Sequence, residues 1–261
     1  MMKDPKVLIV GYGTVGRNLY KELSALTPSV YDKYKEVIIC GKKQVYDPDI
    51  KYDFAFICVD TPLKPDTTEL DTSEVAKAIH DNNAHIYIIK STCPIGFTET
   101  LSRFTHKNIV YSPEYYGGTQ HCNNFEFNFT ILGGNKKSCI EVQQLLQECY
   151  DARHTFHIVD SDTAEIVKFM ENSWIATKVS FCTQFFDIAK AHNCDYETLR
   201  ELFILDPRVN PSHTFVYSDH PYWSSHCLNK DVSHIANKED SAGLLRDIIK
   251  FNEDMKDSYK E

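Results

Sequence analysis

Residues 6–23, KVLIVGYGTVGRNLYKEL, combine a short apolar strand, a glycine-rich turn and a helix whose leucines recur at helical spacing. The turn has the pattern G-x-G-x-x-G, in which the chain bends tightly and a pyrophosphate can approach the first turn of the helix. We therefore predict a unit that binds a dinucleotide; the alternative is a glycine turn that serves packing only. The predicted cofactor contacts in this turn are Gly11, Gly13, Thr14, Val15 and Gly16.

Asp32 follows Gly11 by 21 residues and comes at the end of the second predicted strand. In dinucleotide-binding folds a carboxylate at this place accepts hydrogen bonds from the ribose, and its charge repels the 2′-phosphate of NADP. We therefore predict that the cofactor is NAD.

The chain then alternates strand and helix patterns as far as TFHIV, residues 155–159. This alternation is typical of a mainly parallel sheet with helices on both faces. From Asp160 onward the pattern is helical, and about thirty residues pass without proline or glycine. We expect an α/β fold: a Rossmann-like NAD-binding domain over residues 1–159 and an all-helical domain over residues 160–261.

The composition narrows the classes of partner. The 261 residues carry a formal net charge of −9 and contain no apolar run of the roughly 18 residues that a membrane span needs. Nucleic acid and membranes are therefore unexpected partners, and a small-molecule substrate is favoured. The nine cysteines never form a C-x-x-C pair, so we expect neither a disulfide framework nor a metal site. Without an apolar leader after the first methionine, we expect a cytoplasmic protein.

In the long helical segment, Lys168 and Asn172 head a line of apolar residues at helical spacing. That line continues through Ile175, Val179, Cys182, Phe186 and Ala189. The predicted solvent face consists of Ser173, Thr177, Ser180, Gln184 and Asp187. Burial of a lone ammonium group is costly, so Lys168 is either functional or a lysine whose stem packs while its head reaches water.

The segment CLNKD, residues 227–231, places a cysteine shortly before Lys230 and Asp231. If a helix begins near Leu228, its dipole and the neighbouring ammonium group favour the thiolate form of Cys227. This arrangement suits a nucleophile. The alternative is that Cys227, like most of the nine cysteines, is a small apolar packing residue.

Six segments appear in the order and character of the UDP-glucose/GDP-mannose dehydrogenase family, which this chain resembles from Lys6 to about Asn252. They are VGYGTVG, FICVDTP, KSTCPIG, SPEYYGG, AEIVKFMENSWIATKVSF and CLNKDVSHI. The resemblance implies NAD-dependent oxidation of the C6 alcohol of a nucleotide sugar, such as UDP-glucose, to a carboxylate. It also implies that a cysteine carries the thiohemiacetal and thioester intermediates.

The resemblance implies roles for the residues that act on the sugar. Cys227 corresponds to the nucleophile, and Asp231 and Glu114 correspond to the carboxylates that handle water and protons. Lys168 and Asn172 correspond to the pair that stabilises the oxyanion. These types belong together because a thiolate captures an aldehyde, a cation stabilises an oxyanion and a carboxylate activates water. Glu114, Lys168 and Asn172 are also predicted to contact the substrate.

Further roles follow from the same resemblance. Thr92 corresponds to a threonine between the cofactor and the reacting centre, and Thr61 and Pro62 correspond to a cofactor-contacting pair. Lys230, beside the nucleophile, is placed among the cofactor contacts. Arg208 resembles the substrate-binding arginine that the family presents across its dimer.

The chain departs from the family pattern in three places. The family has glycines before its cysteine, whereas residues 222–226 are YWSSH, so we expect side chains in the path of the sugar. The segment between Asp32 and Asp53 is shorter than usual. We also expect the family's second α/β domain, which grips the nucleotide, to be absent. The apolar surface of the long helix predicts a homodimer through the helical domain.

Two alternatives stay open. A β-hydroxyacid dehydrogenase also joins a Rossmann domain to helices with a Lys-x-x-x-Asn pair, and it would transfer a single hydride without using Cys227. The other alternative is a non-catalytic, dimeric NAD-binding remnant.

Overall fold

The computed structural model describes residues 4–44, 46–47, 49–116 and 126–259. The chain divides into two compact units, each described by itself below. The sheet unit consists of residues up to Lys64 together with Leu70–Lys168, and the helical unit consists of Pro65–Glu69 together with Phe169–Glu261.

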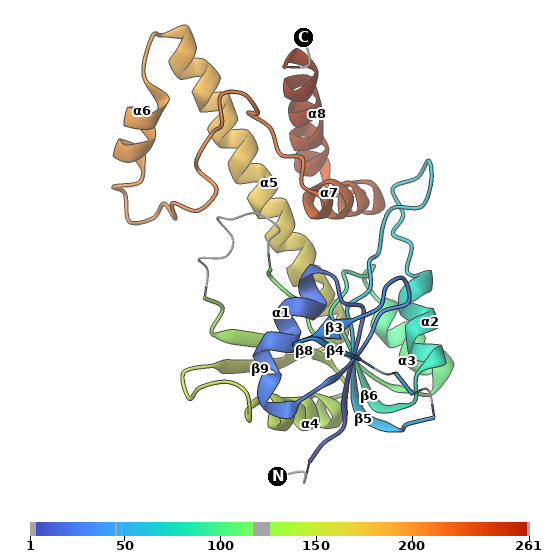
Figure 1. Ribbon diagram of the computed structural model, residues 1–261. Helices are drawn as coiled ribbons and strands as arrows, with labels where there is room; N and C mark the ends of the chain where they lie inside the picture. The colour runs from blue at the N-terminus through green and yellow to red at the C-terminus, as the bar shows by residue number, and fades with distance from the viewer. Residues whose placement is uncertain (1–3, 45, 48, 117–125, 260–261) are drawn as a thin grey trace. The chain divides into compact units, whose positions relative to one another are not determined.

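The sheet unit is built on a seven-stranded sheet with the order β2-β1-β5-β6-β7-β8-β9 (Figure 1). Neighbouring strands pair in parallel except β7 and β8, which are antiparallel. The strands are β1 (Val7–Val10), β2 (Ser29–Tyr31), β5 (Tyr52–Ile57), β6 (Ala84–Ile89), β7 (Asn108–Tyr111), β8 (Phe129–Gly134) and β9 (Thr155–Val159). The predicted mainly parallel α/β fold is confirmed.

Helices cover both faces of this sheet. The helices of the sheet unit are α1 (Thr14–Glu22), α2 (Ser73–Asp81), α3 (Phe97–Thr105) and α4 (Lys136–Leu146), with a short 3-10 helix at Ser24–Leu26. Side chains of α1 and α4 pack on one face, and those of α2, α3 and the start of α5 pack on the other. Because parallel strands are buried on both faces, all four residues of β1 lie in the core, which explains the continuous apolar run VLIV.

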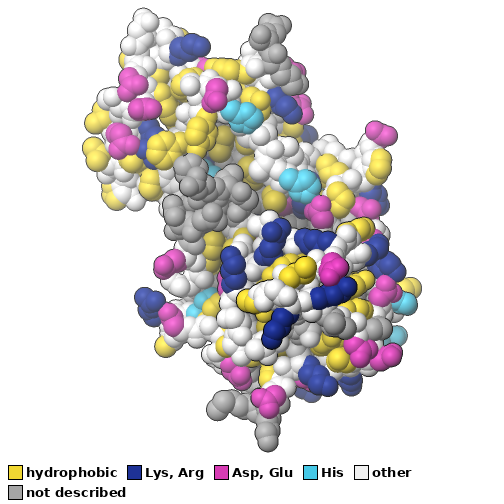
Figure 2. Space-filling view, in the orientation of Figure 1, with side chains coloured by type: hydrophobic (Ala, Val, Ile, Leu, Met, Phe, Trp, Pro, Cys, Tyr) yellow, Lys and Arg dark blue, Asp and Glu magenta, His cyan; other side chains and the backbone are white. Residues whose placement is uncertain are grey.

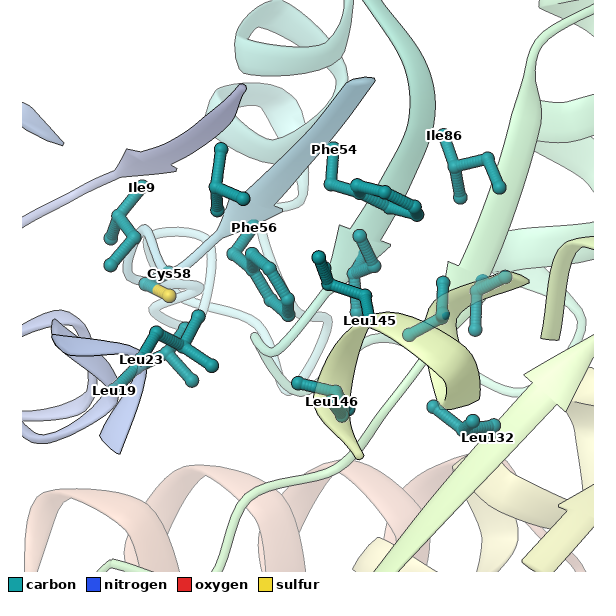
Figure 3. Packing of buried hydrophobic residues seen from close by; sticks show 14 of the residues in the cluster. Ile9, Leu19, Leu23, Phe54, Phe56, Cys58, Ile86, Leu132, Leu145 and Leu146 are labelled. Atoms are coloured by element: carbon teal, nitrogen blue, oxygen red, sulfur yellow. The ribbon is translucent and has the colours of Figure 1, made fainter. Parts of the chain in front are cut away.

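Figure 3 shows the core beneath α1 and α4. Ile9 from β1 and Phe56 from β5 point toward Leu19 and Leu23 of α1, while Leu145 of α4 packs on the same face. The next residues along each strand, such as Leu8, belong to the core on the opposite face. Each fully buried leucine or phenylalanine of this kind stabilises the fold by about 1.5–3 kcal/mol.

The short segment after Asp32 forms a separate antiparallel hairpin, β3 (Ile38–Ile39) and β4 (Lys42–Lys43). Its two turn residues, Cys40 and Gly41, have φ values of +50° and +74°. Positive φ at both central positions is the geometry that matches the twist of two-residue hairpins. The hairpin lies within the segment between Asp32 and Asp53, which the sequence analysis describes as shorter than usual.

The helical unit contains most of α5 (Ser161–Ala191), which begins in the sheet unit, and α6 (Tyr196–Phe203), α7 (His226–Lys238) and α8 (Gly243–Ser258). Its main core joins α5, α7 and α8 through Ala176, Trp223, Leu228, Val232 and Ile248. None of the helices in the described residues is long and apolar enough to cross a membrane.

The predicted solvent face of α5 is wrong in its first half. Ser173 and Ser180 are buried, whereas the exposed side chains of this helix include Met170, Trp174, Phe181, Phe185 and Ile188. The Ser180 hydroxyl is buried because it accepts a hydrogen bond from the Trp223 indole, described below. The exposed face of α5 is therefore rich in large apolar side chains.

Candidate active site

The glycine turn has the geometry that a dinucleotide requires. Gly11 has a φ of +92°, and a Cβ atom there would lie 2.7 Å from the Cys58 carbonyl oxygen. A Cβ atom on Gly16 would lie 2.0 Å from the Gly11 oxygen, so only glycine lets α1 approach β1 so closely. Gly13 has no neighbour within 4 Å of such an atom, and no side chain caps α1 there. The open approach and the available N–H groups of the first turn fit a pyrophosphate.

Asp32 lies directly after β2, and its carboxylate is fixed against the glycine turn. Its Oδ2 accepts a hydrogen bond from the main-chain N–H of Tyr12 at 2.8 Å, and its Oδ1 accepts one from Tyr34 at 3.0 Å. The ammonium group of Lys35 lies 3.7 Å from Oδ2 and donates to the Tyr12 carbonyl at 2.7 Å. The sequence did not predict a role for Lys35, because no pattern indicated that its side chain folds back onto the turn.

Thr61 and Thr92 come together at the carboxyl edge of the sheet. The Thr61 hydroxyl donates a hydrogen bond of 2.8 Å to the Thr92 carbonyl, which joins the segments after β5 and β6. Both threonines are buried, and Pro62 is exposed. Because cofactors bind at the carboxyl edge of parallel strands, this pair has the position expected of cofactor-contacting residues.

Glu114 follows β7 at the same edge, and its Oε2 accepts a hydrogen bond of 2.7 Å from the N–H of Tyr116. The neighbouring Tyr115 ring lies 5.3 Å from the Lys168 ammonium nitrogen, a cation–π contact. Lys168 is only 6% exposed, two turns inside α5. This burial does not fit the alternative in which Lys168 reaches water at the helix end. The segment KSTCPIG also contains Lys90, whose ammonium group donates to Ser112 Oγ at 3.2 Å, and burial lowers the pKa of Lys90.

Glu165 is a residue that sequence reasoning missed. Its fully buried carboxylate accepts hydrogen bonds from the N–H of Gly96 at 2.6 Å and from the N–H and hydroxyl of Thr98 at 3.0 and 2.6 Å. It therefore holds the start of α3, just after Thr92, against the first turns of α5, three residues before Lys168. Burial raises the pKa of Glu165 to about 7, although the hydrogen bonds oppose this shift.

In the helical unit, three predicted site residues form one buried network. The Asn172 amide donates a hydrogen bond of 2.6 Å to Asp231 Oδ2, and the Lys230 ammonium group donates one of 2.6 Å to Asp231 Oδ1. Asp231 is 1% exposed, and Asn172 and Lys230 are nearly as buried. α5 and α7 therefore meet through a carboxylate that orients both an amide and an ammonium group.

Cys227 is the second residue of α7, which begins at His226 rather than near Leu228. The Ser225 hydroxyl caps this helix by accepting a 3.2 Å hydrogen bond from the N–H of Leu228. Cys227 is exposed, unlike Cys58, where burial raises the pKa to about 12. An accessible sulfur in the first turn of a helix, one turn before Lys230 and Asp231, is in a place where negative charge is stabilised.

Residues 222–226 have structural roles in the helical unit. The Trp223 indole N–H donates a hydrogen bond of 3.0 Å to Ser180 Oγ of α5. The main chain of Trp223 forms two hydrogen bonds with the Asn252 side chain on α8, at 2.9 and 3.0 Å. The largest side chain of this segment therefore belongs to the core of the helical unit, while Ser224, Ser225 and His226 are exposed.

Arg208 lies in the loop after α6, where its guanidinium group pairs with Asp206 at 2.6 Å and its side chain is 88% exposed. The loop is anchored from within by Arg200, whose Nε donates to Thr214 Oγ1 at 2.9 Å. Arg208 is thus presented on the surface of the unit. Within the described residues, no group of three or more His, Cys, Asp or Glu side chains could hold a metal ion.

In comparisons with known proteins, the N-terminal and C-terminal parts of the chain each match a domain of one protein family. Residues 34–154 match the NAD binding domain of the UDP-glucose/GDP-mannose dehydrogenase family, and residues 162–257 match its central domain. The NAD binding domain and the glycine turn together identify NAD as the cofactor.

Individual curated relatives are also nucleotide-sugar dehydrogenases. The UDP-N-acetyl-D-mannosamine dehydrogenase of Pyrococcus horikoshii is 26% identical over 272 residues, covering 94% of this chain and 63% of the relative. The UDP-glucose 6-dehydrogenase of Campylobacter jejuni is 27% identical over 212 residues, covering 77% of this chain and 53% of the relative. The chain thus spans less than two thirds of the length of these curated relatives.

Solved structures show the same fold. A UDP-glucose dehydrogenase from Pyrobaculum islandicum superposes with a TM-score of 0.79 at 20% identity, over 96% of this chain and 68% of that one. With two matched domains in the family's order, the chain belongs to the UDP-glucose/GDP-mannose dehydrogenase family.

Proposed function

We propose that the protein uses NAD to oxidise the C6 alcohol of a nucleotide sugar to a carboxylate, with Cys227 as the nucleophile. The observation that carries this proposal is the network of Asn172, Lys230 and Asp231 one helical turn from an exposed thiol. A buried ammonium group and amide, both oriented by one carboxylate, are costly to maintain for stability alone. Beside a nucleophile, the oriented Asn172 amide provides a donor for a developing oxyanion.

The proposed chemistry assigns a group to each step. When bound, NAD would accept the hydride that leaves C6 in each of two oxidations, and in the first of them a carboxylate takes up the hydroxyl proton. The Cys227 thiolate adds to the aldehyde carbon after the first oxidation, and loss of the second hydride from the thiohemiacetal leaves a thioester. Water then adds to the thioester, a carboxylate takes up its proton, and the C–S bond breaks to return the thiolate.

Within this scheme, Lys168 and Asn172 donate to the oxyanion, and Glu114 serves as the carboxylate that accepts protons. Asp231 holds Asn172 and Lys230 in place, because each of its oxygens accepts a bond from one of them. Thr61 and Thr92 contact the cofactor from the edge of the sheet.

The proposed substrate is a UDP-hexose. The two relatives described above are named for UDP-N-acetyl-D-mannosamine and UDP-glucose. These sugars share the C6 alcohol whose first oxidation would give the aldehyde that the thiolate attacks, and a substrate panel decides between them.

We further propose a homodimer through α5. The exposed side chains of Met170, Trp174, Phe181, Phe185 and Ile188 recur at helical spacing along this helix. Single exposed apolar side chains are common on protein surfaces, but a row of five large ones marks an interaction surface. A second copy of the chain would bury this row.

Product stoichiometry tests the function. The protein is incubated with NAD and limiting UDP-glucose, UDP-N-acetylmannosamine or GDP-mannose, and the NADH formed per sugar is counted. Two NADH per sugar are expected from one of the UDP-sugars. One NADH per sugar would instead indicate the single-hydride chemistry of a hydroxyacid dehydrogenase. No NADH from any sugar, with NAD bound in calorimetry, would indicate a non-catalytic binding protein.

A further inference from the structure

The segment that carries Glu114 is anchored on both sides of that residue. Before it, the ammonium group of Lys90, which directly follows β6, donates hydrogen bonds to Ser112 Oγ at 3.2 Å and to the Pro113 carbonyl at 3.4 Å. After it, the main-chain N–H of Tyr116 donates to Glu114 Oε2 at 2.7 Å. The orientation of the Glu114 carboxylate therefore depends on where Tyr116 lies.

Tyr116 is held in turn by Glu22, the last residue of α1. The Tyr116 hydroxyl donates a hydrogen bond to Glu22 Oε1, and the Tyr150 hydroxyl donates one of 2.6 Å to Glu22 Oε2. Tyr150 follows α4, and its ring stacks on His154 with a centroid distance of 4.0 Å. Glu22 is thus fixed through both of its oxygens, and it joins α1 to the segment after β7.

Glu22 differs from the carboxylates at the surface of the sheet unit. Figure 2 shows Lys and Arg side chains gathered on the face of this unit where Figure 1 draws α1 and the β3–β4 hairpin. Surface carboxylates of the unit pair with lysines: Glu74 lies 2.9 Å from Lys33, and Glu36 lies 3.2 Å from Lys43. Glu22 instead accepts two hydroxyl bonds, and burial raises its pKa. Keeping a carboxylate from water is costly, whereas hydrogen bonds to it fix a direction. The arrangement therefore favours orientation over stability.

We propose that Glu22 is a positioning residue that, through Tyr116, fixes the Glu114 carboxylate in the orientation in which it accepts a proton. The role of Glu114 as proton acceptor rests on the proposed function. A base acts only within hydrogen-bond reach of the proton that it removes, and a displacement of about 1 Å can cost about a hundredfold in rate. Tyr116 restricts this displacement, because its hydroxyl bonds to Glu22 while its N–H bonds to Glu114.

Hydrogen exchange of the main-chain amide at position 116, followed by NMR on the full chain, measures how firmly Glu114 is held without any sugar present. In Tyr116→Phe and in Glu22→Ala, protection of this amide should fall about tenfold, because each variant removes the bond between hydroxyl and carboxylate. Tyr150→Phe is the matched control. It removes a hydroxyl from the other oxygen of Glu22, leaves the bond to Tyr116 in place, and should change protection by less than about threefold.

Turnover of the UDP-sugar per folded protein separates positioning from support of the fold. Tyr116→Phe and Glu22→Ala should lower kcat about tenfold or more, while the NAD dissociation constant stays within about twofold because the glycine turn is unchanged. Glu22→Gln should restore kcat to within about threefold of wild type, since the amide oxygen still accepts from Tyr116. Tyr150→Phe should keep kcat within the same limit.

Three results would overturn the proposal. They are unchanged protection in both Tyr116→Phe and Glu22→Ala, an equal loss of protection in Tyr150→Phe, and lost protection with kcat unchanged from an active wild type. A wild type that is silent toward every sugar would refute the proposed oxidation, whereas the protection of the amide at position 116 would still decide whether Glu22 fixes Glu114. The two failures are therefore distinguishable.

Discussion

The sheet unit and the helical unit build their predicted site residues in different ways. In the sheet unit, the glycine turn acts through the main chain: Gly11 and Gly16 are required because any Cβ atom there would meet a carbonyl oxygen. In the helical unit, function is assigned to side chains, and Asn172 reaches Asp231 across 59 residues of sequence. Constraints on the main chain are local and visible in a motif, whereas a side-chain network depends on the packing of the whole unit. Substitutions should therefore affect the two units differently.

The largest expected effect is on the thiol. Cys227→Ser should lower the turnover of a nucleotide sugar by at least about a thousandfold, because a serine hydroxyl at the same place is a far poorer nucleophile without a base to activate it. NAD affinity should stay within about twofold, since the glycine turn is unchanged. Initial rates of NADH formation and calorimetry measure the two quantities.

Cys194→Ser is the matched control, because Cys194 is also an exposed thiol of the helical unit but lies in the loop between α5 and α6. It should leave turnover unchanged. Equal activity of Cys227→Ser and wild type would show that Cys227 is not the nucleophile.

The next effect concerns the buried network. Asp231→Ala removes the carboxylate that accepts hydrogen bonds from the Lys230 ammonium group and the Asn172 amide, and we expect the free energy of unfolding to fall by about 3–5 kcal/mol, the cost of breaking a buried ion pair by removing one member. Chemical denaturation measures this loss. Asp206→Ala, which breaks the exposed pair with Arg208, should cost less than about 1 kcal/mol.

The double variant Lys230→Met, Asp231→Leu distinguishes charge from packing. It should recover much of the stability, because neither charge then stays buried, while turnover remains lost. If Asp231→Ala is as stable as the Asp206→Ala control, the network is not held by its charges.

The two units also differ in how much of their fold and of their site residues could be predicted from the sequence. The glycine turn, the position of Asp32 and the alternation of strands and helices follow from short patterns, so the fold of the sheet unit could be derived before the structure. Lys35 could not, because its contact with the turn depends on how the chain bends after β2. Glu165 bonds to Gly96, 69 residues earlier, and no spacing rule connects them. The predicted roles of Cys227 and its neighbours came from family resemblance, and they stay predictions until turnover is measured.

Glu165 gives the sheet unit a pH dependence of its own. Burial raises its pKa from 4.5 to about 7 in the folded protein, so the folded state binds this proton more tightly than the unfolded chain does. The free energy of unfolding should therefore fall as pH rises from about 4.5 to about 7, by up to about 3 kcal/mol at 1.4 kcal/mol per pH unit. Denaturation midpoints across this range measure the slope.

Glu165→Gln should flatten the slope over this window, because glutamine does not titrate. Glu99→Gln, at an exposed carboxylate on α3 that pairs with Arg103, should leave it unchanged. A stability that is instead flat between about pH 5 and 7 but rises with pH below about pH 4.5, with that rise absent in Glu165→Gln, would show that the three hydrogen bonds outweigh burial and lower this pKa.

The smallest expected effect tests whether residues 222–226 serve structure rather than chemistry. Trp223→Phe keeps most of the buried ring but removes the indole donor to Ser180, so we expect a loss of about 1 kcal/mol in the free energy of unfolding. Ser180→Ala removes the other end of the same bond, and the two substitutions should be non-additive in a double-mutant cycle. Turnover per folded protein should change little in either variant, because the indole faces α5 and the core of its own unit. A large change in the Michaelis constant for the sugar, with stability unaffected, would instead place Trp223 in the substrate site.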